Sequence, residues 1–104
     1  MAEIVWKQGA ENDLLQIFAE LEARHERAGE EFVTRLDSTL ANVREHPEIA
    51  PMYEPPVRRL VIASAGFGLF YTSEPRGIIV HALIHLSRSP DTIRARIRRT
   101  LRLE

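Results

Sequence analysis

The chain has 104 residues, of which 44% are hydrophobic and 28% are charged, and its formal net charge is −1. This profile predicts one globular domain spanning residues 1–104. Because the sequence contains no cysteine, a disulfide scaffold, a thiolate metal site and a cysteine nucleophile are excluded.

The N-terminal half predicts a short strand followed by two helices. Residues 4–6 are β-prone and predict the strand. From Asn12 or Asp13 onward, apolar residues recur at helical spacing, with Leu15 as an additional candidate: Leu14, Ile17, Phe18 and Leu21. A second series follows Gly29, which is expected to interrupt the pattern, and ends before Pro47: Phe32, Val33, Leu36, Leu40 and Val43. We therefore predict a helical hairpin.

The C-terminal half predicts a β-meander and a final helix. Segment 47–56 holds four of the six prolines without periodicity and is expected to be an ordered loop. Three runs rich in β-branched and aromatic residues follow, with turn sequences between them: residues 57–63, 67–73 and 77–86. Ser89-Pro90-Asp91 then supplies an N-cap, a proline at the first helical position and an acid in the first turn of a helix that extends to about Leu101.

These elements predict an α+β two-layer sandwich. The N-terminal helical hairpin is expected to pack on a small, mainly antiparallel sheet, because a sheet of this size must bury one face. A basic helix is expected to end the chain.

Charge divides the chain within the proline-rich region. Residues 1–57 carry five basic and twelve acidic side chains, a net charge of −7, whereas residues 58–104 carry nine and three, a net charge of +6. All basic residues except Lys7 are arginines, whose planar guanidinium groups suit bidentate contact with phosphate or carboxylate. Two interpretations stay open: the basic half binds an anionic partner, or it neutralises the acidic half within the molecule.

Histidines and arginines of the predicted sheet are candidate site residues. His81 and His85 are expected on one face of a strand, about 13 Å apart, which is too far for a shared metal ion. We therefore predict no metal site and leave both histidines as sheet-surface or substrate-facing residues. Arg58 and Arg59 should point to opposite faces of their strand, so that one supports the fold and the other lies on the face without helices.

The C-terminal region is the most basic part of the chain. Six arginines fall within fifteen residues: Arg88, Arg94, Arg96, Arg98, Arg99 and Arg102. The helix also carries an apolar stripe, Ile93, Ile97 and Leu101, which packs either on its own domain or on a partner. No aromatic side chain interleaves with these arginines in the sequence, which argues against stacking on single-stranded nucleic acid.

Several motifs spread over nearly the whole chain carry a family resemblance. They are Ala10, Asp13, Leu14 and Ile17, then His46-Pro47-Glu48, Val57-Arg58-Arg59-Leu60 and Phe67-Gly68-Leu69-Phe70-Tyr71, and finally a strand closing in a His85-x-x-Arg88-x-Pro90 signature. These motifs and the order of elements resemble the RelE/ParE superfamily of type II toxin-antitoxin toxins, especially its ParE-like, plasmid-stabilisation branch. The resemblance implies a small toxin held inactive in a hetero-oligomer by a cognate antitoxin.

RelE-like members of this superfamily cleave messenger RNA on the ribosome, and by that resemblance Arg59, His85 and Arg88 are the catalytic candidates. Attack by a 2′-hydroxyl needs a proton acceptor, a proton donor and cations for the developing charge. This sequence departs from the ribonuclease pattern: Lys7 is its only lysine, no tyrosine follows Tyr71, and the aromatic strand lacks the arginine common in ribonuclease members. The ribonuclease set is therefore incomplete.

ParE-like members lack that set, resemble this chain better, and poison DNA gyrase by binding. We therefore expect a toxin without catalysis of its own and without a cofactor, with DNA gyrase as its target. Two alternatives stay open: a RelE-like ribosome-dependent mRNA endonuclease, and a non-toxic binding or regulatory module of the same fold. Target or antitoxin binding is assigned to ten residues: Arg58, Arg59, His81, His85, Arg88, Ile93, Arg94, Ile97, Arg98 and Leu101.

The location of the protein is expected to be cytoplasmic. Residues 1–7 lack the basic end and apolar run of a signal peptide. The most apolar stretch, residues 60–71, is too short to span a bilayer as a helix. We therefore expect no contact with a membrane.

Overall fold

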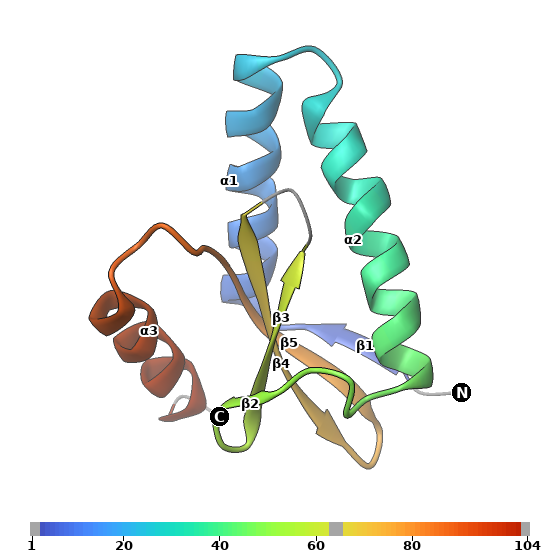
Figure 1. Cartoon of the computed structure of the whole chain (residues 1–104), viewed down its shortest axis with the longest axis vertical. Helices are drawn as coiled ribbons and strands as arrows, with labels where there is room; N and C mark the ends of the chain where they lie inside the picture. The colour runs from blue at the N-terminus through green and yellow to red at the C-terminus, as the bar shows by residue number, and fades with distance from the viewer. Residues whose placement is uncertain (1–2, 63–65, 103–104) are drawn as a thin grey trace.

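A five-stranded sheet carries helices on both faces (Figure 1). The computed structural model describes residues 3–62 and 66–102. In chain order the elements are β1 (Glu3–Trp6), α1 (Gln8–Arg24), α2 (Ala28–Glu45), β2 (Met52–Glu54), β3 (Val57–Ile62), β4 (Phe67–Glu74), β5 (Gly77–His85) and α3 (Pro90–Arg102). The strand order is β1-β5-β4-β3-β2, with β1 parallel to β5 and every other pair antiparallel. The predicted α+β architecture with a mainly antiparallel sheet is confirmed.

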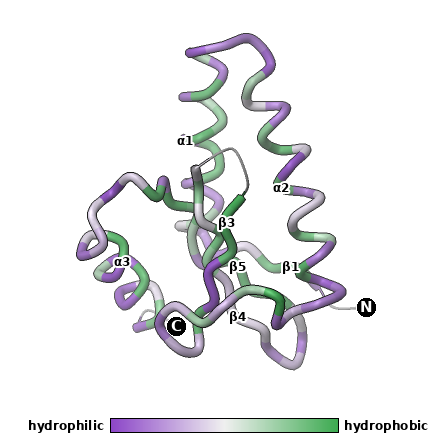
Figure 2. The backbone as a smooth tube through the Cα atoms, in the orientation of Figure 1, coloured by the Kyte–Doolittle hydropathy of each residue, from purple (hydrophilic) through white to green (hydrophobic). Residues whose placement is uncertain are grey.

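Two hydrophobic clusters, one on each face, hold the helices on the sheet. The hairpin of α1 and α2 buries its inner face against one side, where Phe32 meets Phe67 edge to face at 5.2 Å between ring centroids. On the opposite side α3 covers a smaller cluster: Val57, Phe70, Ala82, Ile84, Ile93 and Ile97. Hydrophobic segments gather in the strands, whereas the far end of the hairpin is hydrophilic (Figure 2). The C-terminal helix is therefore an additional covering of the second face.

The first helix begins earlier than its apolar pattern indicates. It starts at Gln8, several residues before the predicted Asn12 or Asp13, because a first turn can be helical without contributing to the buried stripe. Leu15 is 69% exposed, so this side chain does not belong to the stripe. Ala10, which lies in this first turn, is fully buried.

The break between the two helices lies before Gly29, so the prediction that Gly29 interrupts the pattern is wrong. Arg27 adopts the left-handed conformation with φ of 68° and precedes α2, and Gly29 lies inside that helix. A Cβ atom on Gly29 would stand 2.8 Å from a ring carbon of Phe18, so the glycine permits close approach of the two helices. Its backbone N–H donates to Glu22 Oε2 at 2.7 Å, which joins the helix ends.

The proline-rich segment contains a strand that its sequence does not predict. Residues 52–54 form β2, which pairs Met52 with Arg58 at the edge of the sheet. Three residues are too few to show an apolar alternation, and the pairing depends on β3 alone. Flanking prolines limit the length of this edge strand.

The other predicted strands and the helix cap agree closely with the structure. The described strands cover residues 57–62, 67–74 and 77–85, while Ala63 and the turn residues 64 and 65 lie outside the described residues. Ser89 caps α3 as predicted, since its Oγ accepts the N–H of Thr92 at 3.2 Å. Pro90 is the first helical residue.

A β-bulge at His81 changes the faces of β5. Phe70 pairs with Ala82 and Tyr71 with Val80, so His81 is an extra residue opposite β4. The bulge reverses the alternation of faces: Val80 joins the hairpin-side cluster and Ala82 the α3-side cluster. The side chains of β5 therefore do not alternate strictly between faces from His81 to His85.

Candidate functional site

Arg58 and Arg59 point to opposite faces of β3, as alternation predicts. Arg58 lies opposite Tyr71 in the β3–β4 pairing, and the side chain of Tyr71 belongs to the cluster on the hairpin side of the sheet. The guanidinium of Arg58 donates to the carbonyl of Ala50 at 2.7 Å. Arg59 pairs with Phe70 of the α3 side. Arg58 thus supports the segment before β2, whereas Arg59 lies on a face that α3 partly covers, not on the uncovered face expected from the sequence.

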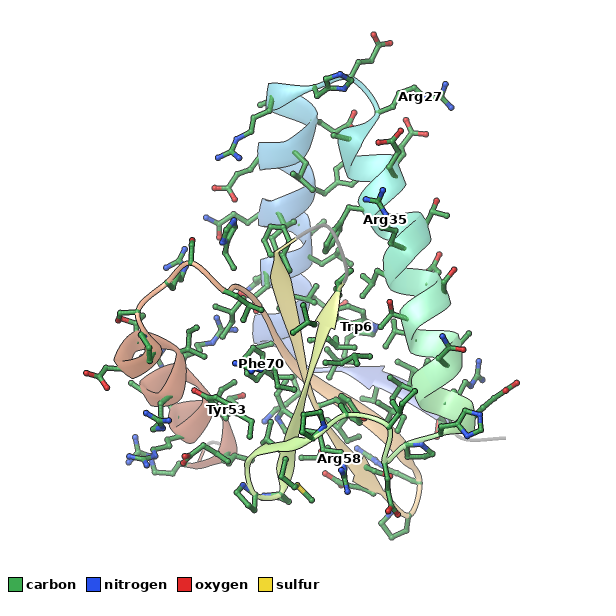
Figure 3. The ribbon with its side chains drawn as sticks, viewed as in Figure 1. Trp6, Arg27, Arg35, Tyr53, Arg58 and Phe70 are labelled. Carbon is green, nitrogen blue, oxygen red and sulfur yellow. The ribbon has the colours of Figure 1, made fainter. Side chains whose placement is uncertain are left out.

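Two arginines lie over one aromatic ring on the α3 side of the sheet. The guanidinium carbons of Arg59 and Arg94 stand 5.7 and 5.8 Å from the centroid of the Tyr53 ring. Phe70 meets the same ring edge to face at 5.2 Å. Figure 3 shows Tyr53 and Phe70 between the sheet and α3. An aromatic residue thus does lie among the arginines, but it comes from β2 and is packed into the docking site of α3.

Glu54 joins two arginines of α3. Its carboxylate accepts from Arg98 Nε at 3.0 Å and from Arg94 Nε at 3.2 Å. The hydrogen bond from Arg98, followed by charge attraction and the bond from Arg94, holds the pKa of Glu54 below its ordinary value of 4.5 against the opposing effect of desolvation. These pairs connect the acidic half of the chain with the basic half, as the neutralisation interpretation predicts.

The apolar stripe of α3 packs on its own sheet. Ile93 is 5% exposed and Ile97 is fully buried, and Leu101 packs against the same cluster. Of the two interpretations of the stripe, the structure shows packing on the parent domain. These three residues hold α3 in place and do not face a partner while the helix is docked.

The two histidines occupy different environments on opposite faces. His81 is 1% exposed, and its Nε2 lies 2.9 Å from Thr72 Oγ1 on the α3 side of β4. His85 is exposed; its ring meets Phe67 of the hairpin side at 4.8 Å, and its Nδ1 accepts the N–H of Ser87 at 3.1 Å. The prediction of a shared face is wrong because the bulge intervenes. Only His85 is open to a ligand.

A groove of about 740 Å³ runs between α1 and α3, with the end of β5 beside it. Three predicted site residues line it: His85, Arg88 and Ile93. The remaining cationic lining comes from residues that the sequence did not single out as a group: Arg24, Arg96 and Arg99. The groove is the place where basic side chains from distant segments come together.

Asp13 connects the two helices of this groove. Its carboxylate accepts two hydrogen bonds from the guanidinium of Arg96, at 3.1 and 2.7 Å, and one from the backbone N–H of Leu83 at 3.0 Å. β1 pairs with β5 only as far as Val80, so beyond that point no strand of the described residues lies next to this edge of β5. Asp13 satisfies a backbone donor there and fixes α3 at the same time.

Sequence comparison decides the family. The family described as "ParE toxin of type II toxin-antitoxin system, parDE" matches residues 4–90. The chain is a member of the ParE toxin family. Among solved structures, a chain of the chromosomal ParDE TA system from P. aeruginosa shares the fold, with a TM-score of 0.60 and 16% identity over 83% of this chain and 97% of that one. A search of curated proteins finds no match.

The ribonuclease candidates do not converge in this ParE-family chain. Arg59 lies beside Tyr53 on the α3 side of the sheet, while His85 packs against Phe67 of the hairpin side. Arg88 follows β5 and lines the α1–α3 groove with His85. A general acid or base must reach the same reacting atoms as the groups that stabilise charge, and the sheet separates Arg59 from His85.

Residues 3–62 and 66–102 contain no group of three His, Asp or Glu side chains arranged to hold a metal ion. Over the same residues, the helices are too short or too polar to cross a bilayer.

The Glu54 pairs predict a defined dependence of stability on pH. Because the pKa of Glu54 is lowered on folding, its contribution to stability is complete above pH 4.5 and is lost as the pH falls through the folded-state pKa. We expect a Glu54→Gln variant to unfold at lower urea concentration than the parent near neutral pH, and the difference to shrink in acid. Urea midpoints measured from neutral pH downward test this. A difference that is independent of pH would contradict it.

The groove residues that were not predicted from the sequence are only weakly marked in it. Arg24 and Asp13 appeared only as polar residues of an amphipathic helix, and Arg96 and Arg99 as members of a basic run. Their roles depend on which helix faces approach each other. No local pattern carries that information.

Proposed function

We propose that this ParE-family toxin arrests growth by binding DNA gyrase and that a cognate antitoxin neutralises it in a hetero-oligomer. The match over residues 4–90 supports the toxin assignment. The observation that favours binding over catalysis is the separation of Arg59 from His85 by the sheet. Gyrase and antitoxin would both be met in the cytoplasm, which also suits a chain without cysteine.

The surface proposed to bind the target or the antitoxin is the arginine-rich side around α3. Arg88 and His85 are exposed at the groove, and Arg98 is exposed on the helix although it pairs with Glu54. The other assigned residues act from within, because they hold α3 and the sheet in the shape that a partner would meet: Arg58, Arg59, His81, Ile93, Arg94, Ile97 and Leu101.

Inducible expression of the full chain tests this proposal. We expect growth to stop, with gyrase-linked breaks accumulating in DNA while messenger RNA stays intact. Co-expression of a cognate antitoxin should restore growth. An uninduced culture and a strain whose gyrase resists the toxin serve as controls.

Two other outcomes would replace the proposal by its alternatives. Codon-specific cuts in ribosome-bound messages, with DNA intact, would establish the ribosome-dependent mRNA endonuclease. Antitoxin binding without any effect on growth would establish a non-toxic regulatory module of the same fold.

A further inference from the structure

We propose that Ser87 is a phosphoryl-acceptor site, in which the His85 imidazole activates the Ser87 hydroxyl for attack on the terminal phosphorus of a nucleoside triphosphate. Both residues are exposed, His85 as the last residue of β5 and Ser87 in the turn that follows. This covalent modification of the chain is separate from the proposed function, because it requires neither gyrase nor an antitoxin.

The Ser87 hydroxyl lies against an imidazole nitrogen that can take its proton. Ser87 Oγ is 2.7 Å from His85 Nδ1, and the backbone N–H of Ser87 donates to the same nitrogen at 3.1 Å. Because an N–H can only donate, Nδ1 is the unprotonated nitrogen of the neutral ring. The hydroxyl therefore donates to Nδ1 as well, which leaves its oxygen lone pairs available to an electrophile. A serine hydroxyl beside a general base is the arrangement that nucleophilic attack requires.

Packing and the turn hold the two groups in this position. The His85 ring meets Phe67 edge to face at 4.8 Å between ring centroids. The backbone N–H of Arg88 donates to the carbonyl of His85 at 3.1 Å, which closes the turn and brings Ser87 back towards the ring. Base and nucleophile are thus oriented before a substrate arrives, and such orientation lowers the entropic part of a reaction barrier.

A second hydroxyl-imidazole pair in the sheet shows why access matters. Thr72 Oγ1 lies 2.9 Å from His81 Nε2, which is nearly the same contact. Thr72 is 3% exposed and His81 is 1% exposed, so a triphosphate cannot reach them. The Thr72 hydroxyl also donates to Glu74 at 3.0 Å. We therefore expect reaction at Ser87 and none at Thr72.

The charges that share the groove with Ser87 favour a phosphoryl group over a neutral acyl group. Three arginines in the lining form no ion pair with any described residue: Arg24, Arg88 and Arg99. Of the two carboxylates in the lining, Asp13 pairs with Arg96, which leaves Glu20 against three cations. Guanidinium groups bind phosphate through charge-assisted hydrogen bonds and stabilise the charge of a phosphoryl group during transfer.

The groove also has the size of a small-molecule site. Its volume is about 740 Å³, within the range of roughly 300–1,000 Å³ that ligand sites occupy. The donor is expected to arrive as its magnesium complex, so the metal belongs to the substrate.

The transfer step balances without a further reactant. A bond forms between Ser87 Oγ and the γ-phosphorus, while the bond from that phosphorus to the β–γ bridging oxygen breaks. The nucleoside diphosphate leaves with the electron pair of the broken bond, and the hydroxyl proton passes to His85 Nδ1. The phosphoserine adds a charge of about −1.5 to −2 beside the arginines, so the modification lowers the positive charge of the groove.

Labelling of the purified full chain tests the inference. The probe is magnesium ATP labelled in its γ-phosphate, and tandem mass spectrometry locates the modified residue. We expect the parent to take up one phosphoryl group, on Ser87, and the Ser87→Ala variant to take up at least about tenfold less. A matched variant, Ser73→Ala, removes an exposed hydroxyl of β4 outside the groove and should label as the parent does.

A His85→Ala variant distinguishes a general base from a residue that only supports the turn. We expect its labelling to be at least about tenfold slower than that of the parent. Free imidazole should restore part of the rate, because it can occupy the vacated space and take the proton. Urea unfolding verifies that the variant is folded. A kinase contaminating the preparation would label Ser87 independently of both His85 and imidazole.

A double variant, Arg88→Gln/Arg99→Gln, tests the role of the arginines. We expect the KM for ATP to rise at least about tenfold, because two charged contacts to phosphate are lost. Arg35→Gln/Arg76→Gln is the matched control and should leave KM unchanged. Both of its residues are exposed, on α2 and in the β4–β5 turn, and neither lines the groove; Figure 3 labels Arg35 on α2.

Four results would overturn the inference: no phosphoryl transfer to the parent, label on a residue other than Ser87, labelling of His85→Ala at the rate of the parent, or equal KM values for the two double variants. Label on His85 itself or on Ser89 counts among the second. Failure of the proposed function would leave these results unchanged, because the assay contains neither gyrase nor antitoxin.

Discussion

Replacing Asp13 by alanine is expected to lower the free energy of unfolding by about 3 kcal/mol. The change leaves Arg96 without its carboxylate and the N–H of Leu83 without its acceptor. The side chain of Asp13 is 15% exposed and that of Arg96 is 26% exposed. Water can therefore replace only part of the lost hydrogen bonding and charge pairing. Urea denaturation followed by circular dichroism measures the effect.

Glu20→Ala is the matched control for this substitution. Glu20 lies on the same helix at the same groove, but it is exposed and forms no ion pair with any described residue. We expect its removal to change the free energy of unfolding by less than about 0.5 kcal/mol. A double-mutant cycle with Arg96→Ala then isolates the Asp13–Arg96 coupling. An Asp13→Ala variant as stable as the Glu20→Ala variant would show that the pair does not hold α3.

Truncating Ile97 to alanine is expected to lower the free energy of unfolding by about 3 kcal/mol. Ile97 is fully buried between α3 and the sheet, so the change removes packed methyl groups and leaves a cavity. The docking of α3 depends on a small apolar cluster, and backbone amides of α3 should exchange hydrogen faster in the variant. Urea unfolding and hydrogen exchange measure the two effects.

Leu15→Ala provides the comparison, because it removes a similar volume from a helix at a side chain that is 69% exposed. We expect a change of about 0.5 kcal/mol or less. Should Ile97→Ala prove as mild as Leu15→Ala, the packing of α3 on the sheet would not contribute to stability. Unchanged exchange in α3 would lead to the same conclusion.

Local patterns were sufficient for most of the fold. The amphipathic stripe of α2 and the Ser89-Pro90 start of α3 act on near neighbours in the chain, so they can be read from short stretches. The same holds for the three main strands. β2 was missed because its three residues become a strand only by pairing with β3.

Strict alternation of side chains along a strand predicted the faces of the site residues only in part. It placed Arg58 and Arg59 correctly on opposite faces of β3, where the ladder is regular. It failed for His81 and His85, because a single extra residue opposite β4 moves every later side chain to the other face. Bulges depend on pairing between strands and leave no reliable trace in one strand's sequence.

The sequence by itself determined the order of the elements, the division of charge near residue 57 and the resemblance to ParE toxins. Only the tertiary structure decided where those charges go: Asp13 meets Arg96 across 83 residues and Glu54 meets Arg94 across 40, while Arg24, Arg88 and Arg99 gather at the groove. Periodicity and capping act over a few neighbouring residues, whereas charge pairing requires the packing of segments far apart in the chain. The near-neutral total therefore concealed both an internal set of ion pairs and a basic groove.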